Sequence, residues 1–402
     1  MNRRQRRHAR RVATGGAWLL TACALAGCPS PPGAPSSETA ASAGLPTPAP
    51  LLRAEPVPVE APVGLPRLAH GDGWLLLAWT ERGLGTRGDA LFFSARSFED
   101  GRWRDRTPLS QTVASGSSLQ LVSARPRAVA VSWSAPIGGG QLRPWIATSD
   151  DAGRRFSAPE ILASAPAGAT FLGAPLKPGG PWRVTAPASE AATPTAAPIS
   201  MQPPTPDAHI EALQVCAGGG PLALWCDDSD RASLGTIAAA HAVGTDARCV
   251  PGPRPLACRR NRIAVAARSA GSGEAWLWVG QSPTALRRLA PLPGVVTAVP
   301  LVTWVDDAHV LAVWIDDRRT VHATTTALDG GPSPVRTLAT GVLDASATVS
   351  SDPPRLYVAW TTSPAAADED RGPLQLGSLA LPDGMLAAPS PTTPLDPRGP
   401  TR

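Results

Sequence analysis

The sequence of 402 residues contains few of the side chains that carry out common enzyme chemistry. It holds one tyrosine and six histidines, and the histidines form neither an H-x-x-x-H pair nor a Cys/His cluster with zinc-ligand spacing. No G-x-S-x-G nucleophile motif, phosphate-binding loop or dinucleotide fingerprint occurs. The motifs therefore predict no metal, no cofactor and no catalytic residue.

An apolar run near the amino end, VATGGAWLLTACALAG, is too short to span a bilayer as a stable helix. It follows a basic stretch and precedes Cys28, which is the order found in export signals. The boundary LAGC, ending at Cys28, resembles the lipobox of bacterial lipoproteins. That resemblance implies removal of residues 1–27 and acylation of Cys28. Pro29 in place of Asp resembles an outer-membrane sorting signal, so we expect a lipid-anchored protein of the bacterial cell envelope. An ordinary secretory signal and a twin-arginine signal are the alternatives.

The basic excess of the chain lies in this signal. Residues 1–27 hold six arginines and no acid, so their removal lowers the basic count from 37 to 31, against 32 acidic residues. The overall charge of +5 therefore does not describe the mature protein. This balance argues against a nucleic-acid partner.

Composition divides the remaining chain into three parts. Residues 28–63 are rich in Pro, Ala and Ser and poor in residues that can be buried, which predicts a disordered tether. Residues 64–390 are long enough for a large β domain, and 391–402 are expected to form a disordered tail.

A repeat in the central part predicts its fold. Apolar strands ending in tryptophan recur, with weaker copies that end in Ala186 and Ala267. Their mean spacing is about 47 residues, the length of a four-stranded propeller blade. Short apolar runs bounded by turn residues fill each period, without a helical pattern. We therefore predict an all-β protein, a β-propeller of seven four-stranded blades, with six or eight blades as alternatives.

The tryptophans of these strands are expected to pack between blades, because the middle strands of a blade are covered on both faces. An aromatic platform for sugar is the alternative. The residues concerned are Trp79, Trp133, Trp225, Trp314 and Trp360.

The segment SDDAGRRF, residues 149–156, falls at the turn before the last strand of the second blade. It resembles the Asp-box, or BNR repeat, of sialidase-like propellers, with Ser149, Asp151, Gly153 and Phe156 at the four motif positions. In such a turn Ser and Asp accept backbone N–H groups, Gly permits positive φ, and the aromatic ring anchors the loop.

The resemblance extends to the fold but not to sialidase catalysis. Sialidases use a tyrosine nucleophile and an Arg-Ile-Pro segment, whereas the one tyrosine here, Tyr357, lies inside an apolar strand and no Arg-Ile-Pro occurs. Acid pairs that follow apolar strands are the remaining catalytic or cation-binding candidates, although Asp also caps turns. They are Asp227, Asp228, Asp306, Asp307, Asp316 and Asp317.

Four cysteines remain after Cys23 leaves with the signal and Cys28 carries lipid: Cys216, Cys226, Cys249 and Cys258. In an oxidising envelope they predict two disulfides with three connectivities. We favour Cys216 with Cys226 and Cys249 with Cys258, because each pair closes a short loop. A site of four thiolates is the less favoured alternative, since neither spacing is C-x-x-C.

Together these features predict a non-enzymatic envelope propeller that binds or scaffolds a protein or polysaccharide. The membrane would be contacted through the N-terminal lipid. The alternatives are a glycan-cleaving enzyme with an altered site and a structural part of an envelope assembly.

Overall fold

The protein is described here by a computed structural model. It covers residues 50–57, 59, 63–71, 73–82, 89–113, 119–123, 127–138, 141–161, 173–175, 182–184, 199–201, 204–205, 208–215, 221–235, 240–329, 334–351, 354–362 and 372–381. These residues form antiparallel β-sheets and one 3-10 turn, η2 (Pro283–Ala285), with no α-helix among them. The described part contains no helix long and apolar enough to cross a membrane.

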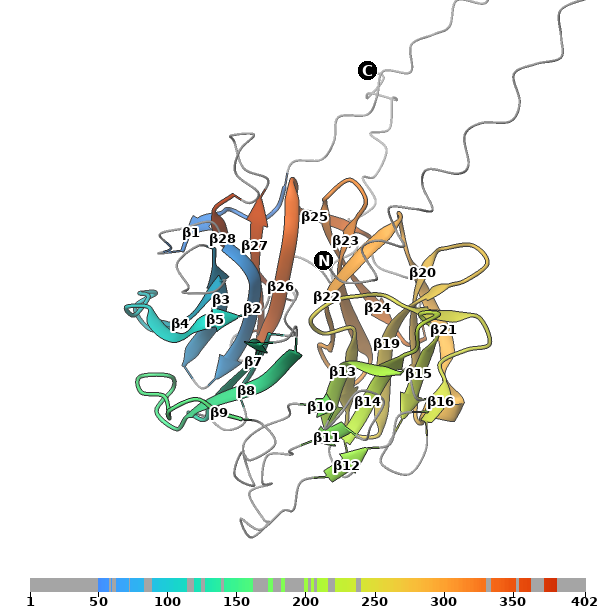
Figure 1. Cartoon of the computed structure of the whole chain (residues 1–402). Helices are drawn as coiled ribbons and strands as arrows, with labels where there is room; N and C mark the ends of the chain where they lie inside the picture. Colours follow the sequence, from blue (N-terminus) through green and yellow to red (C-terminus); the bar gives the residue numbers. More distant parts are fainter. Residues whose placement is uncertain are drawn as a thin grey trace, which may run out of the picture. The chain divides into compact units, whose positions relative to one another are not determined.

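The described residues form six blades around a centre, each blade four strands wide (Figure 1). Blade 1 consists of β2 (Val63–Gly71), β3 (Trp74–Glu81), β4 (Asp89–Ser97) and β5 (Thr107–Val113). Blade 2 consists of β6 (Gln120–Ser123), β7 (Val129–Gly138), β8 (Gln141–Ser149) and β9 (Glu160–Ile161). Blade 4 consists of β13 (His209–Val215), β14 (Pro221–Cys226), β15 (Ala232–Gly235) and β16 (Ala240–Ala242).

The remaining three blades follow in the second half of the chain. Blade 5 consists of β19 (Arg262–Ser269), β20 (Ala275–Gly280), β21 (Arg287–Leu292) and two short strands, β17 (Ala247–Cys249) and β18 (Leu256–Arg259). β17 and β18 pair in turn with the same edge of β19, so this blade is also four strands wide. Blade 6 consists of β22 (Val296–Trp304), β23 (His309–Asp316), β24 (Val321–Ala327) and β25 (Arg336–Ala339). Blade 7 consists of β26 (Val342–Ser351), β27 (Pro354–Thr362), β28 (Leu374–Ala380) and β1 (Glu55–Pro56).

A three-stranded sheet, sheet 3, occupies the place in the chain where the third blade was expected. It contains β10 (Gly173–Pro175), β11 (Trp182–Val184) and β12 (Ile199–Met201). The predicted all-β propeller is therefore confirmed, and the described residues form six four-stranded blades rather than the seven predicted. Ala186, the expected anchor of the third repeat, lies outside the described residues.

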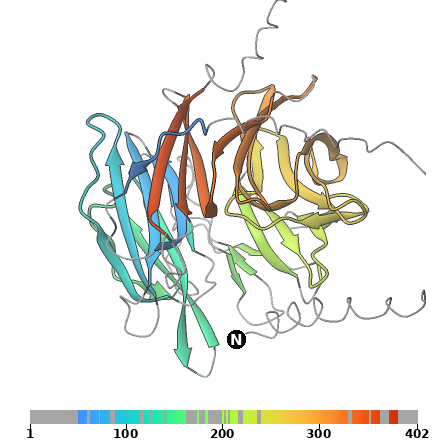
Figure 2. The same ribbon diagram turned by 90° about the horizontal axis from the view of Figure 1, so that it is seen from above.

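The innermost strands form the wall of the centre. β2 contacts β6 and β26, β26 contacts β22, β22 contacts β18, and β13 contacts β18 and β10. Seen from above, the sheets stand around this centre with their outer strands toward the rim (Figure 2). The tryptophan strands β3, β7, β14, β23 and β27 are each second from the centre, so both of their faces are covered.

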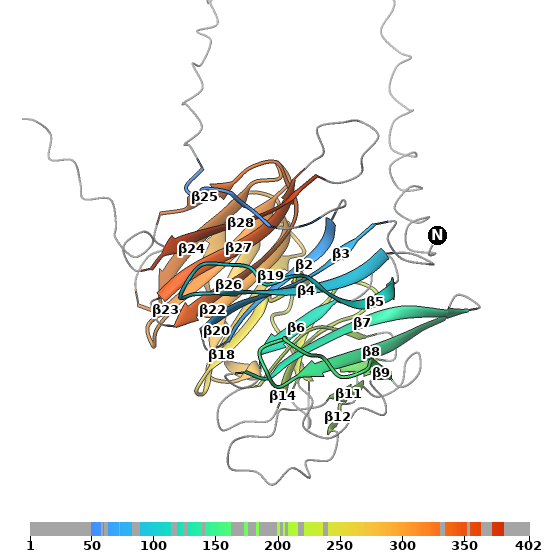
Figure 3. The ribbon, with the colours of Figure 1, turned by 90° about the vertical axis from the view of Figure 1, so that its left-hand side faces the viewer.

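The ring is closed by the segment that precedes the first blade. β1 pairs with β28 through Glu55 and Pro56, and the amide of Leu52 donates to the carbonyl of Leu338 in β25. Figure 3 shows this blue segment beside the orange and red strands from the end of the domain. Residues 50–57 therefore lie on the propeller, whereas the sequence placed them in the tether.

Candidate functional site

The Asp-box of blade 2 is a hydrogen-bonded turn between β8 and β9. Ser149 Oγ accepts the amide of Gly153 at 2.9 Å and donates to Asp151 Oδ1 at 2.8 Å. Asp151 Oδ1 also accepts the amide of Arg155 at 2.9 Å. Burial alone would raise the pKa of Asp151, but the bonds from Arg155, Ser149 and Arg154 outweigh it and hold that pKa below its ordinary value.

The turn is anchored on blade 1. Gly153 has φ +79°, and a Cβ at this position would lie 2.1 Å from Phe93 Cε1. The ring of Phe156 meets Phe93 edge to face, with centroids 4.9 Å apart. The four motif residues thus have the roles that their resemblance implied, in a turn that joins two blades by packing.

The repeated tryptophans are packing residues. Trp79, Trp133, Trp225, Trp314 and Trp360 are each at most 3% exposed. Four of them belong to apolar clusters that join neighbouring blades. No face of these five rings is open to stack on a sugar, so the platform alternative is wrong for them.

The acids that follow the strands mainly organise turns. Asp227 Oδ1 accepts the amides of Ser229 and Arg231, and Asp306 Oδ1 accepts those of Ala308 and His309. Asp316 Oδ1 does the same with Arg318 and Thr320. These bonds match the capping interpretation.

The neighbouring acids of the same pairs differ among themselves. Asp307 forms exposed ion pairs with Arg259 at 2.9 Å and Arg260 at 2.6 Å. The amide of Asp317 donates to the carbonyl of Val295, and Asp228 is exposed. The six acids do not form a ring around the centre.

The remaining sequence candidates are equally dispersed. His70, His309 and His322 lie on separate strands, and the described residues contain no group of three His, Cys, Asp or Glu side chains that would hold a metal. Tyr357 is 7% exposed and stacks on Phe98 with centroids 5.5 Å apart, as expected for a core residue. Burial raises the pKa of this phenol.

The favoured disulfide pairing is wrong. Cys226 is bonded to Cys249, with their Cα atoms 6.1 Å apart, and Cys258 is also disulfide-bonded. Cys226 ends β14 of blade 4 and Cys249 ends β17 of blade 5, so the bond joins two blades rather than closing a hairpin. Cys216 lies outside the described residues, as do Cys28, residues 1–27 and the tail at 391–402.

A cavity of about 360 Å³ lies at the centre and is lined by polar side chains that have no counterpart in the predicted repeat. Innermost strands from blades 1, 2, 4, 5, 6 and 7 line it. Its charged and titratable side chains are Arg67, His70, Glu211 and Arg254. This volume is within the range of small-ligand sites.

Irregular backbone places the charged groups of the cavity. Arg67 follows a β-bulge in β2, and Glu211 lies in a bulge of β13. Arg254 belongs to VPGPRP, the segment that separates β17 from β18 along the same edge of β19. Its three prolines have no N–H to donate, so the ladder stops there. Glycine is required at Gly252, where a Cβ would lie 2.1 Å from the carbonyl oxygen of Val299.

The two arginines reach the same strand from different blades. Arg67 Nε donates to the carbonyl of Leu119 at 2.9 Å, and Arg254 donates to the carbonyl of Leu121 at 3.4 Å. Burial lowers the pKa of Arg67, while Asp344 and Glu211 act in the opposite direction. For Arg254, burial and then the charge of Arg67 lower the pKa to about 10.

Within the described part of the chain, Arg254 forms hydrogen bonds but no salt bridge. The described residues give it no ion pair, and its other side-chain bond is to the hydroxyl of Thr348 at 3.4 Å. His70 also contacts this hydroxyl, at 3.2 Å from Nδ1. Burial, followed by the charge of Arg254, lowers the pKa of His70, so this ring is neutral at pH 7. The channel is electropositive around Arg254.

Sequence reasoning did not single out any of these channel residues. The channel arginines look like the other arginines in the sequence, and the bulges carry no motif. The proline-rich VPGPRP segment, with a lone arginine inside a predicted blade, was the available signal.

Comparison with known proteins supports the fold and leaves the activity open. No protein-family model and no curated protein matches the chain. Among solved structures, the BP39L lectin from Burkholderia pseudomallei is 11% identical with a TM-score of 0.50, and the match covers 78% of this chain and 95% of the lectin. The NanB sialidase from Streptococcus pneumoniae is 10% identical with a TM-score of 0.45, over 80% of this chain and 68% of the sialidase.

A prolyl endopeptidase is 11% identical with a TM-score of 0.46, over 80% of this chain, which spans half the length of that enzyme. Similarity at these identities concerns the fold alone. The ring of blades shows a β-propeller, and its Asp-box turn resembles that of sialidase-like propellers.

Proposed function

We propose that the protein is a binding module of the cell envelope that holds an acidic polysaccharide at its central channel. The observation that carries the proposal is Arg254, a largely enclosed guanidinium with no carboxylate partner among the described residues. A buried charge that lacks a partner is costly, and a bound anion would compensate it. Arg67 lies close enough to repel Arg254, so one anion would interact favourably with both.

A binding role fits the carboxylates better than glycoside hydrolysis does. Hydrolysis of the usual kind needs two carboxyl groups that flank the sugar. Within the described part of the channel wall, Glu211 is the carboxylate that lines the cavity, and its Oε1 accepts the amide of Gly252 at 3.1 Å. Glu211 thus supports the loop that carries Arg254.

The first experiment compares polygalacturonate, which carries carboxylates, with uncharged dextran. The full chain is expected to bind the polyanion, and Arg254→Gln is expected to weaken binding about tenfold or more, the value of a charge-assisted hydrogen bond. Arg259→Gln is the matched control, because Arg259 is exposed outside the cavity. Equal binding of dextran, or equal losses in both variants, would refute the proposal.

A second candidate function is cleavage of a glycan. It is favoured by one observation, that a carboxylate, Glu211, and an imidazole, His70, line the same cavity, and both group types serve as general acids or bases in enzymes. Release of reducing ends or unsaturated products from an acidic glycan panel, abolished by His70→Asn, would establish this function. Intact glycans after prolonged incubation would leave binding alone.

Attachment to the envelope is proposed from the lipobox-like LAGC and Cys28. The lipid would tether the domain through the Pro-rich segment, at the outer membrane if Pro29 acts as it does in known sorting signals. Cell fractionation tests this: Cys28→Ala should move the protein from the membrane to the soluble fraction. Quantitative membrane retention of that variant would contradict the anchor.

A further inference from the structure

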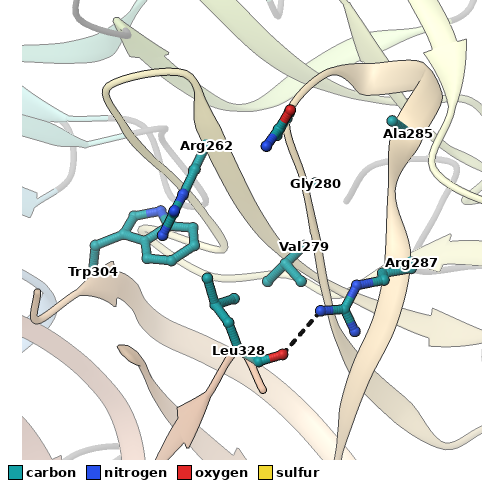
Figure 4. Close-up of a pocket in the computed structure, with 8 residues that line it drawn as sticks. Arg262, Val279, Gly280, Ala285, Arg287, Trp304 and Leu328 are labelled. Atoms are coloured by element: carbon teal, nitrogen blue, oxygen red, sulfur yellow. Dashed lines mark hydrogen bonds between the residues drawn. The ribbon is translucent and has the colours of Figure 1, made fainter. Parts of the chain in front are cut away.

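A second cavity, of about 300 Å³, lies at the junction of blades 5 and 6, and it shares no lining residue with the central cavity. Blade 5 contributes Arg262, Val279 and Arg287, and blade 6 contributes Trp304 at the end of β22. Leu328, just after β24, completes the wall. Figure 4 shows Trp304 beneath Arg262 on one side, with Arg287 and Leu328 across from them.

The indole of Trp304 carries a buried donor that the described residues leave unused. Trp304 is 7% exposed, and its Nε1 has no hydrogen-bond partner among them. Figure 4 places the nitrogen-bearing edge of the ring on the side of Arg262, whose guanidinium is also a pure donor. Two donors cannot satisfy each other, so the Trp304 N–H is left without an acceptor among the described residues.

The two arginines add positive charge without matching acids. Arg287 donates to the carbonyl of Leu328 at 2.9 Å, and Arg262 donates to the carbonyl of Asp307. Neither forms a salt bridge within the described part of the chain, while the nearby Asp307 carboxylate is paired with Arg259 and Arg260. Each guanidinium has further N–H groups available for a ligand.

Apart from the exposed Gln281, the rest of the cavity is apolar, and its wall is tightly built. Val279 is 3% exposed, and Leu328 and Ala285 close the sides. A Cβ at Gly280 would lie 2.4 Å from the carbonyl oxygen of Ala285, so η2 packs directly on the backbone here. The walls suit an apolar body, and the donors suit an anionic end.

We propose that this junction is a second binding site, which takes a small carboxylate with an apolar body about the size of one six-membered ring. The carboxylate would accept the Trp304 N–H and pair with Arg262 and Arg287, while the ring would contact Val279 and Leu328. This site does not depend on the function proposed for the channel.

The test uses 4-fluorobenzoate as the probe, followed by ¹⁹F NMR titration of the full chain. Trp304→Phe keeps the ring and removes the N–H, and it should weaken binding about fivefold to tenfold, as expected for a hydrogen bond to a charged group. Its folding stability should be unchanged or higher, because the lost N–H has no partner in the protein. Arg287→Gln should weaken binding by a similar factor.

Trp278→Phe is the matched control. Trp278 is also 7% exposed and its Nε1 also lacks a partner among the described residues, but it does not line the cavity. Equal weakening by Trp278→Phe and Trp304→Phe would overturn the site. So would unchanged binding in Trp304→Phe.

Two further arms fix the ligand chemistry and the location. 4-Fluorobenzamide, which lacks the charge, should bind at least tenfold more weakly than 4-fluorobenzoate, and equal affinity would overturn the carboxylate. In competition, glucuronate should displace the probe less well than benzoate, and the reverse order would overturn the apolar body. Arg254→Gln should leave probe binding unchanged, whereas loss of binding there would move the probe to the channel and overturn this proposal.

Discussion

Replacement of Gly153 by alanine should destabilise the propeller for two separable reasons. The first is backbone strain, since φ is +79° and an L-residue in this region costs about 1–2 kcal/mol. The second is overlap, because the new Cβ would lie 2.1 Å from Phe93 Cε1 and 2.5 Å from its Cζ, and overpacking a core costs about 1–3 kcal/mol. Alanine also reduces the conformational entropy of the unfolded chain, which stabilises the folded protein by about 0.4–1 kcal/mol. The net loss in the free energy of unfolding is expected to be about 1–5 kcal/mol.

Gly73→Ala isolates the first of these contributions. Gly73 has φ +72°, and a Cβ there would have nothing within 4 Å. Gly73→Ala should therefore lower the free energy of unfolding by about 1 kcal/mol. This value is the cost of backbone strain minus the gain from the reduced entropy of the unfolded chain. Urea unfolding followed by tryptophan fluorescence measures both variants, with equal m-values as the check that the unfolded state is unchanged.

A double-mutant cycle then tests the contact itself. Phe93→Leu shortens the side chain that overlaps the new Cβ, so Gly153→Ala should cost less in that background than in the wild type. If Gly153→Ala and Gly73→Ala lose the same stability, or if Phe93→Leu changes nothing, the Asp-box turn is not fixed by its packing on blade 1.

Two other predictions address the links between and within blades. Replacing Cys226 and Cys249 together by serine opens a loop with a sequence separation of 23, and the chain-entropy model gives a loss of about 3 kcal/mol in unfolding free energy. Non-reducing peptide mapping of the wild type should find these two cysteines linked, and a Cys216–Cys226 peptide would contradict the structure. The other prediction concerns Asp316. Burial raises the pKa of this carboxyl, but hydrogen bonds from His322 and Thr320 outweigh burial and lower the pKa overall. Its stabilising contribution should therefore be present above about pH 4 and be lost as pH falls through the lowered value. As pH is lowered from 7 to 2, the unfolding free energy of Asp316→Asn should fall less steeply than that of the wild type. An identical pH dependence in the two proteins would contradict this.

The fold was predictable because its information is local and repeated. Each tryptophan strand is an apolar run bounded by turn residues, and the period of about 47 residues identifies the blade. The Asp-box was predictable for the same reason, since Ser149, Asp151 and Gly153 bond within one turn. Such interactions depend on a few consecutive residues, so a single sequence reveals them.

The disulfide and the ring closure were not predictable, because they join segments whose proximity depends on the completed ring. Cys226 and Cys249 meet since blades 4 and 5 are neighbours, and a loop-closure argument favours nearer cysteines instead. Glu55 and Pro56 look like tether in composition, yet they pair with β28 at the far end of the domain. Strands that pair across such a long sequence separation share no pattern that a single sequence would reveal.

The channel site was missed for a related reason, and its irregularity is itself informative. A regular propeller needs continuous innermost strands, but bulges interrupt β2 at Arg67 and β13 at Glu211, and a segment with three prolines and Arg254 separates β17 from β18. These interruptions remove ladder hydrogen bonds and enclose a cation that has no carboxylate partner among the described residues, so both features oppose stability. Departures from local consistency are expected where a protein serves a ligand rather than its own fold. The five repeated tryptophans serve packing and the Asp-box serves a turn, whereas the interrupted backbone around Arg254 serves neither and points to the channel.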